Sequence, residues 1–182
     1  TKIVKYSYAT GKVVDTLLNL NQIKDVEIKS INEYEFSADE SRILLMTNPE
    51  RIYRRSFTAD YFVFSFKNRE LVPLSKNGKQ RLATFSPNGN RIAFVRDNNL
   101  FLVDLINKEE KQITNDGKAE SIINGSTDWV YEEEFSFTQA FFWSPSGKYI
   151  AFYKFDESKV REFQLTFYGQ LYPKIDNYKY PK

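Results

Sequence analysis

The chain of 182 residues contains no histidine and no cysteine. A hydrolase of the Ser-His-Asp type needs an imidazole to take and return the proton of its nucleophile, so this chain cannot carry a complete triad. Without cysteine it can form neither a disulfide framework nor a thiolate nucleophile, and zinc sites built from histidine and cysteine are excluded as well. We therefore expect this chain to hold no catalytic residue, no metal and no cofactor.

Long apolar runs and a one-sided charge are also missing. No apolar run approaches the roughly 18 residues of a transmembrane helix. The 26 basic and 24 acidic side chains leave a net charge of +2 and form no basic stripe, so nucleic acid is not an expected partner. Residues 1–3 lack a signal-peptide pattern and resemble the middle of a strand, as if the chain had been cut there.

Aromatic residues supply much of the apolar surface, with 16 phenylalanines and 12 tyrosines. Both residue types favour pleated, half-buried strands, which predicts an all-β protein. One pattern recurs along the chain, at residues 36–45, 85–94 and 143–152. Each copy consists of an aromatic residue, a turn that starts with serine, a basic residue and an apolar strand.

The middle copy shows the physics of this repeat. Pro87 presets its own φ to about −65°, and Gly89 supplies the positive φ that a hairpin turn tends to need. Two further strands complete each unit, and four antiparallel strands in ~45–50 residues is the period of a β-propeller blade. The alternative is an ordinary antiparallel meander whose turns resemble one another by coincidence.

The predicted fold is therefore all-β, a partial β-propeller of about three four-stranded antiparallel blades with a short helix inserted near residues 128–134. We expect a single propeller domain over residues 1–182. Its parts are a half blade at about 1–20 and blades at about 31–76, 80–115 and 118–170, the last of which carries the insertion. Closed propellers need about four to eight blades, so open edges should remain and edge-to-edge association of two copies is expected.

The insertion carries three consecutive glutamates at residues 132–134. Asp128 precedes them and is suited to cap the first turn of a short helix. Two adjacent carboxylates on a loop above a rigid propeller can bind an ammonium group through charge-assisted hydrogen bonds. The residues alone leave another interpretation open, because a run of charges is usually a solvated face and the neighbouring aromatics are equally explained as contacts that tie the insertion down.

The string Asp-Trp-Val-Tyr-Glu-Glu-Glu at 128–134, followed by Trp-Ser-Pro-Ser-Gly at 143–147, resembles the dipeptidyl peptidase IV family. In that family this segment is a short propeller helix that faces the active site, and its second and third glutamates bind the α-ammonium group of the substrate. The resemblance implies this role for Glu133 and Glu134. The residues expected to support this loop are Asp128, Trp129 and Tyr131.

The short basic run upstream resembles a second element of the same family. Residues 53–59, Tyr-Arg-Arg-Ser-Phe-Thr-Ala, are similar to a loop whose arginine touches the backbone carbonyl of the substrate, which implies this role for Arg54. A rim arginine that only forms a salt bridge is the alternative. The neighbouring Arg55 departs from the family pattern and has no assigned role. The resemblance extends from about Ile31 to the end of the chain, including the tyrosine-rich tail at 171–182.

The resemblance implies that the parent protein is a serine exopeptidase that releases N-terminal dipeptides, of the X-Pro or X-Ala type, from peptides with a free N-terminus. The family's serine, aspartate and histidine lie in a C-terminal α/β-hydrolase domain, which we expect as the missing partner of this chain. Because the chain contains no Gly-x-Ser-x-Gly elbow, it should be inactive by itself.

Export of the parent protein, to a periplasm, a cell surface or a membrane anchor, also follows from the resemblance, and a homodimer is compatible with it. Two other functions remain as alternatives. One is a stand-alone propeller that acts as a protein-interaction scaffold. The other is the propeller of a different prolyl oligopeptidase-like enzyme, which would not depend on the free amine of its substrate.

Overall fold

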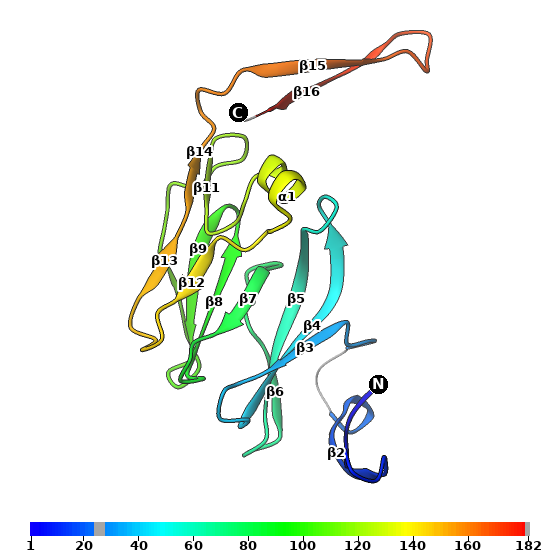
Figure 1. Ribbon diagram of the computed structural model, residues 1–182, viewed down its shortest axis with the longest axis vertical. Coiled ribbons are helices and arrows are strands. Elements are labelled where there is room, and N and C mark those ends of the chain that lie inside the picture. The colour runs from blue at the N-terminus through cyan, green and yellow to red at the C-terminus, as the bar shows by residue number, and fades with distance from the viewer. Residues whose placement is uncertain (24–27, 181–182) are drawn as a thin grey trace.

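The computed structural model describes residues 1–23 and 28–180, and β-strands dominate it (Figure 1). The first strands are β1 (Lys2–Tyr6), β2 (Val13–Asn19), β3 (Glu33–Phe36), β4 (Arg42–Arg51), β5 (Phe57–Ser65) and β6 (Glu70–Pro73). The next strands are β7 (Arg81–Phe85), β8 (Arg91–Arg96), β9 (Asn99–Asp104) and β10 (Glu109–Gln112). The last strands are β11 (Ile122–Asn124), β12 (Phe141–Trp143), β13 (Ile150–Phe152), β14 (Lys154–Asp156), β15 (Glu162–Phe167) and β16 (Lys174–Lys179).

Helical structure within the described ranges is confined to a 3-10 turn, Leu20–Gln22, and the helix α1, Trp129–Phe135. Neither segment has the length and apolar character that a membrane-crossing helix requires. Pro181 and Lys182, the end of the tail that resembles the family pattern, lie outside the described residues.

Two antiparallel sheets follow the order of the chain strand by strand. β3, β4, β5 and β6 form the first sheet, and β7, β8, β9 and β10 form the second. A hairpin of β1 and β2 precedes them. This is the strand order of propeller blades, so the predicted all-β, partial propeller fold is confirmed.

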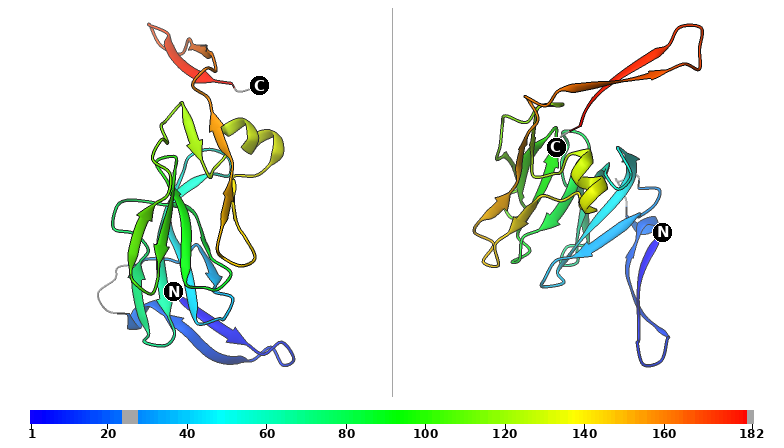
Figure 2. Two further views of the ribbon diagram at one scale, coloured as in Figure 1. Left: turned by 90° about the vertical axis from the view of Figure 1, so that its left-hand side faces the viewer. Right: turned by 45° about the horizontal axis from the view of Figure 1, so that its top comes forward.

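The region after the second sheet is built differently. β11 pairs with β14 and β12 pairs with β13, while β15 and β16 pair only with each other and project from the body as a hairpin (Figures 1 and 2). The stretch 118–170, which the sequence analysis groups as one blade, therefore divides between the body and this hairpin. The helix α1 lies between β11 and β12, so these two strands are not joined by a tight turn as the strands of the first two sheets are.

The serine that opens each repeat has the same role in all three copies. The hydroxyl oxygens of Ser37, Ser86 and Ser144 accept a hydrogen bond from the backbone N–H five residues later, at 3.0, 3.0 and 3.1 Å. The turns also need a residue in the left-handed region, where Gly89 has φ 68° and Gly147 has φ 67°. The repeat in the sequence is thus a repeated turn in the structure.

The core lies between successive sheets. Ile92 and Phe94 of β8 are buried in one cluster with residues of β4 and β5. The alternate residues of the same strand, Ala93 and Val95, are buried in another cluster with Phe141 of β12. Because successive side chains of a strand point to opposite faces, β8 packs on both neighbours and holds the sheets in a stack.

Candidate functional site

The helix α1 begins where the sequence predicts it. Asp128 is its N-cap, and the Oδ1 atom of Asp128 accepts a hydrogen bond from the backbone N–H of Tyr131 at 2.8 Å. The helix ends at Ser136, whose φ of 61° is left-handed and stops further helical hydrogen bonding. This short helix sits at one end of the sheets, beside the turn between β4 and β5 (Figure 1).

The three consecutive glutamates of α1 have three different environments. Glu132 is 2% exposed, the side chain of Glu133 is 28% exposed, and Glu134 lies on the surface. The interpretation of this run as a uniformly solvated face therefore holds for Glu134 alone. A helix rotates each successive residue to a new direction, which is why neighbours in sequence differ so much in burial.

Glu132 binds the loop of residues 52–56, which joins β4 to β5. Its Oε1 atom accepts hydrogen bonds from the backbone N–H of Arg55 at 2.5 Å and of Ser56 at 2.9 Å. The sequence by itself assigns no role to Glu132. The signal that could have found it is its spacing of four from the buried Asp128, which places both on one side of the helix.

Arg54 of this loop reaches the neighbouring glutamate. Its Nη1 atom lies 2.8 Å from the Oε1 atom of Glu133, and the side chain of Arg54 is 68% exposed. The structure thus brings together two of the residues that the resemblance assigns to substrate binding. Arg54 also forms the salt bridge that the alternative interpretation expects, and an exposed pair of this kind stabilises a fold by at most about 1 kcal/mol.

Glu134 completes the candidate set. Its side chain makes no hydrogen bond or ion pair with any other residue in 1–23 or 28–180. Together with Glu133 it gives the exposed side of α1 two carboxylates, one of which is held by Arg54. A hollow of about 440 Å³ adjoins Arg54 and is also lined by Arg51, Arg55 and Phe57. The arrangement can receive a cationic group beside a guanidinium that remains available to a carbonyl oxygen.

Arg55 has a role in the structure that the sequence did not reveal. Its Nη2 atom donates to the hydroxyl oxygen of Ser136 at 3.1 Å, at the end of α1. The loop therefore contacts the helix at Glu132, at Glu133 and at its end, Ser136. This contact, with those of Arg54 and Glu132, fixes the loop and the helix against each other.

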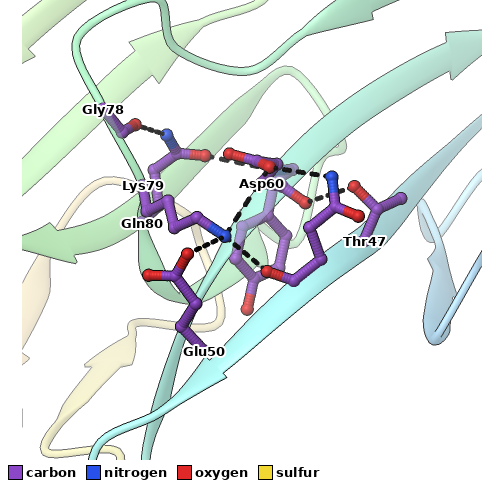
Figure 3. Close-up of polar contacts among 8 residues, drawn as sticks. Thr47, Glu50, Asp60, Gly78, Lys79 and Gln80 are labelled. Atoms are coloured by element: carbon purple, nitrogen blue, oxygen red, sulfur yellow. Dashed lines mark hydrogen bonds and ion pairs between the residues drawn. The ribbon is translucent and has the colours of Figure 1, made fainter. Parts of the chain in front are cut away.

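A polar network at the base of the loop connects it to the second sheet (Figure 3). The pairing of β4 with β5 is irregular between Thr47 and Glu50, just before the loop. The Nζ atom of Lys79, from the segment that leads into β7, donates to the carbonyl oxygen of Asn48 at 2.5 Å. The same atom lies 3.2 Å from Glu50 and 3.8 Å from Asp60. Lys79 therefore holds the irregular end of β4 in place.

Trp129 joins α1 to the projecting hairpin. Its Nε1 atom donates to the carbonyl oxygen of Lys179 in β16 at 2.8 Å. Its ring also packs edge-on against Tyr180, with centroids 5.0 Å apart, and against Tyr53 of the loop at 6.1 Å. Trp129 therefore connects α1 both to β16 of the projecting hairpin and to the loop of residues 52–56.

Tyr131 packs on the opposite side of the same helix. Its ring lies 4.8 Å from that of Phe155, 5.1 Å from that of Phe135 and 6.0 Å from that of Phe137. Aromatic pairs at these distances contribute about 0.5 to 1.5 kcal/mol each beyond the area that they bury. This cluster anchors α1 to β14.

A pair of buried carboxyl groups lies beneath the start of α1. Glu157 is 7% exposed and Asp128 is 4% exposed, and the Oδ2 atom of Asp128 has no hydrogen-bond partner among the described residues. Burial, together with the negative charges of Asp128 and Glu120, raises the pKa of Glu157 to about 7 against the opposing charge of Lys179. Glu157 can therefore exchange a proton near neutral pH.

Within residues 1–23 and 28–180, no group of three or more acidic, histidine or cysteine side chains is arranged to hold a metal ion. A larger hollow of about 980 Å³ lies away from the site, between the outer strands of the first two sheets. It is lined by both charge signs, including Lys67, Glu70 and Lys108, and shares no residue with α1.

Comparison with known proteins finds relatives along most of the chain. Residues 37–182 match the family described as the dipeptidyl peptidase IV (DPP IV) N-terminal region. Dipeptidyl aminopeptidase B of Saccharomyces cerevisiae is 41% identical over 152 residues, which cover 80% of this chain and 18% of that protein. A probable dipeptidyl-aminopeptidase B of Arthroderma gypseum is 39% identical over 162 residues, with the same two shares. The chain thus spans less than a fifth of the length of these curated relatives.

Solved structures agree with the sequence relatives. The crystal structure of Porphyromonas gingivalis dipeptidyl peptidase 4 is 43% identical and has a TM-score of 0.89, covering 100% of this chain, which in turn covers 26% of that protein. A putative dipeptidyl aminopeptidase IV from Bacteroides ovatus is 26% identical with a TM-score of 0.57, covering 94% of this chain and 23% of its own. The first similarity includes all the sheets described above as well as α1.

Proposed function

Because the chain belongs to the dipeptidyl peptidase IV family, we propose that it is the substrate-measuring part of the β-propeller of a serine exopeptidase. The parent enzyme would release N-terminal dipeptides, of the X-Pro or X-Ala type, from peptides with a free N-terminus. The observation that carries this proposal is the ion pair at 2.8 Å between Arg54, in the loop that joins β4 to β5, and Glu133 of α1.

In this proposal Glu133 and Glu134 bind the α-ammonium group of the peptide. An α-amine with a pKa of about 7.7 to 8.0 is mostly cationic at neutral pH, and each carboxylate forms a charge-assisted hydrogen bond with it. Arg54 lies beside the carboxylate of Glu133 and donates to a backbone carbonyl of the substrate. The residues of the loop and α1 that hold them supply a rigid frame.

A fixed binding site for the α-ammonium group determines which peptide bond of the substrate reaches the nucleophile. When the ammonium group is held, the second peptide carbonyl stands at a set distance along an extended chain, opposite the nucleophile of another domain. A peptide with an acylated N-terminus would leave Glu134 desolvated and without a cation, and Glu133 with Arg54 as its counter-charge. Specificity would thus arise from rejection as well as attraction.

The catalytic residues that cleave the peptide bond would lie outside this chain, in the α/β-hydrolase domain of the parent. The purified chain is therefore expected to leave a Gly-Pro chromogenic anilide intact, and cleavage above background would contradict this.

We further propose export of the parent. Homodimerisation of the parent, and edge-to-edge association of the isolated chain, are proposals that light scattering over a range of concentrations would test.

Substitution of the glutamates in the full-length protein tests the amine site. Glu133→Ala and Glu134→Ala should each lower kcat/KM for a Gly-Pro anilide by at least about tenfold, which corresponds to about 1.4 kcal/mol. The matched control is Glu109→Ala, which removes an exposed carboxylate of β10 far from α1. A loss of less than tenfold for both site variants would refute the amine-binding role, and an equal loss for the control would show an effect of charge alone.

A further inference from the structure

Glu132 is held in an unusual position for a glutamate on a short surface helix. It is 2% exposed, and its Oε1 atom accepts the two backbone N–H groups that directly follow Arg54, those of Arg55 and Ser56. A buried carboxylate is costly unless it is hydrogen-bonded and compensated in charge. The contacts of Glu132 therefore indicate a specific role rather than a solvated charge.

The loop of residues 52–56, which Glu132 binds, is short, and backbone hydrogen bonds join its two ends. The backbone N–H groups of Ile52 and Tyr53 both donate to the carbonyl oxygen of Ser56, at 2.9 and 3.3 Å. Arg54 lies inside this closed turn, so a shift of Ser56 moves the backbone of Arg54 with it. The side chain of Arg54 is 68% exposed and cannot be located by packing of its own.

A third group, the guanidinium of Arg81, interacts electrostatically with the carboxylate of Glu132. Arg81 of β7 has a buried guanidinium whose Nε atom has no partner among the described residues, and the carboxylate of Glu132 attracts it electrostatically. Burial lowers the pKa of Arg81, and the neighbouring charges of Glu132 and Tyr61 oppose that effect. Glu132 thus lies where the loop of the first sheet, a strand of the second and the helix α1 come together.

We infer that Glu132 is a positioning residue that sets the distance between Arg54 and Glu133. It stands next to Glu133 on α1 and holds the two amides next to Arg54, so one side chain fixes both halves of the proposed substrate site. This inference rests on the proposed function. A misplacement of about 1 Å in such a site can lower activity about 100-fold, and weaker holding of the ammonium group is expected to appear mainly in KM.

The test is steady-state kinetics of the full-length protein on a Gly-Pro anilide. Glu132→Ala removes the acceptor and should raise KM at least tenfold with a smaller change in kcat. Glu132→Gln keeps an oxygen that can accept from the two amides but loses the charge that attracts Arg81, so KM should rise about threefold. Val130→Ala is the matched control, because it shortens another buried side chain of the same helix, one that cannot hydrogen-bond to the loop, and its KM should stay within twofold of the unmodified protein.

Two results would overturn the inference. One is a KM within twofold of the unmodified protein for every Glu132 variant that folds, and Glu132→Gln serves alone if the alanine variant is insoluble. The other is an equal rise for Val130→Ala, which would mean that any loosening of α1 has this effect. Glu134→Gln in the same series separates the two hypotheses. An unchanged KM there refutes the amine site itself, whereas a raised KM with unaffected Glu132 variants refutes only the positioning role.

Discussion

The guanidinium of Arg54 and the carboxylate of Glu133 meet at 2.8 Å, although one residue lies in the loop between β4 and β5 and the other on α1. Arg54 follows β4, and Glu133 lies on the helix inserted between β11 and β12. The second sheet stands between these elements in the chain, and its Arg81 lies near the same helix. The contact between Arg54 and Glu133 therefore depends on how the first sheet, the second sheet and α1 pack against one another.

Replacement of Arg54 by lysine should weaken substrate binding. Arg54→Lys keeps the charge but loses the planar fork that can serve Glu133 and a carbonyl together, so kcat/KM of the full-length protein should fall about tenfold. Arg161→Lys is the control, since Arg161 is an exposed arginine that makes no ion pair among the described residues and does not line the hollow beside Arg54. Equal losses for both variants on a Gly-Pro anilide would count against a specific role of Arg54.

Loss of the indole N–H of Trp129 should release the projecting hairpin. Trp129→Phe removes the donor to the carbonyl oxygen of Lys179, so amide hydrogen exchange over residues 162–179 should become at least about threefold faster. The control is Trp143→Phe, because the Nε1 atom of Trp143 has no hydrogen-bond partner among the described residues. Unchanged exchange in the Trp129 variant would mean that ring packing alone holds the hairpin.

Glu157 should make stability fall as the pH rises from about 4.5 to 7. The pKa of Glu157 is raised from 4.5 to about 7 in the folded protein, so in this window the unfolded chain has lost a proton that the folded chain retains. The stabilisation is fully present below pH 4.5, is lost as the pH rises through 7, and amounts to about 3 kcal/mol. Urea denaturation at pH 5 and pH 8 measures it. Glu157→Gln should remove this dependence and Glu109→Gln should keep it; a Glu157→Gln variant with an unaltered slope would assign the titration elsewhere.

Substitution by alanine should destabilise the protein by different amounts at Gly11 and Gly89, two glycines with similar positive φ angles. Gly11 has φ 64° with open space around it, whereas a Cβ atom on Gly89, at φ 68°, would lie 3.1 Å from the Cβ atom of Ser37 in the first sheet. Gly11→Ala should therefore cost about 1 kcal/mol of strain, and Gly89→Ala about 2 to 3 kcal/mol. Thermal unfolding gives the two values. Equal losses would show that the turns of neighbouring sheets do not crowd each other.

Much of the fold could be predicted from the sequence because it rests on local chemistry. The repeated serine turns need a glycine or a tolerant residue at one position, and that requirement is visible in the residues around Gly89 and Gly147. The start of α1 was predictable for the same reason, since Asp128 caps the helix through an amide only three residues away. The pairing of β15 with β16 was missed, because the strand pattern at 162–167 does not say which neighbour it will join.

The sequence by itself determined an all-β chain with repeated blades, a capped helix and a family motif around Glu133 and Glu134. Only the tertiary structure decided that the three adjacent glutamates differ, with Glu132 buried under the loop, Glu133 paired with Arg54 and Glu134 free at the surface. The physical reason is that turns and caps are made by atoms a few residues apart. Burial and charge pairing at the site are instead made by the stacking of sheets, which brings together side chains that have no relation along the chain.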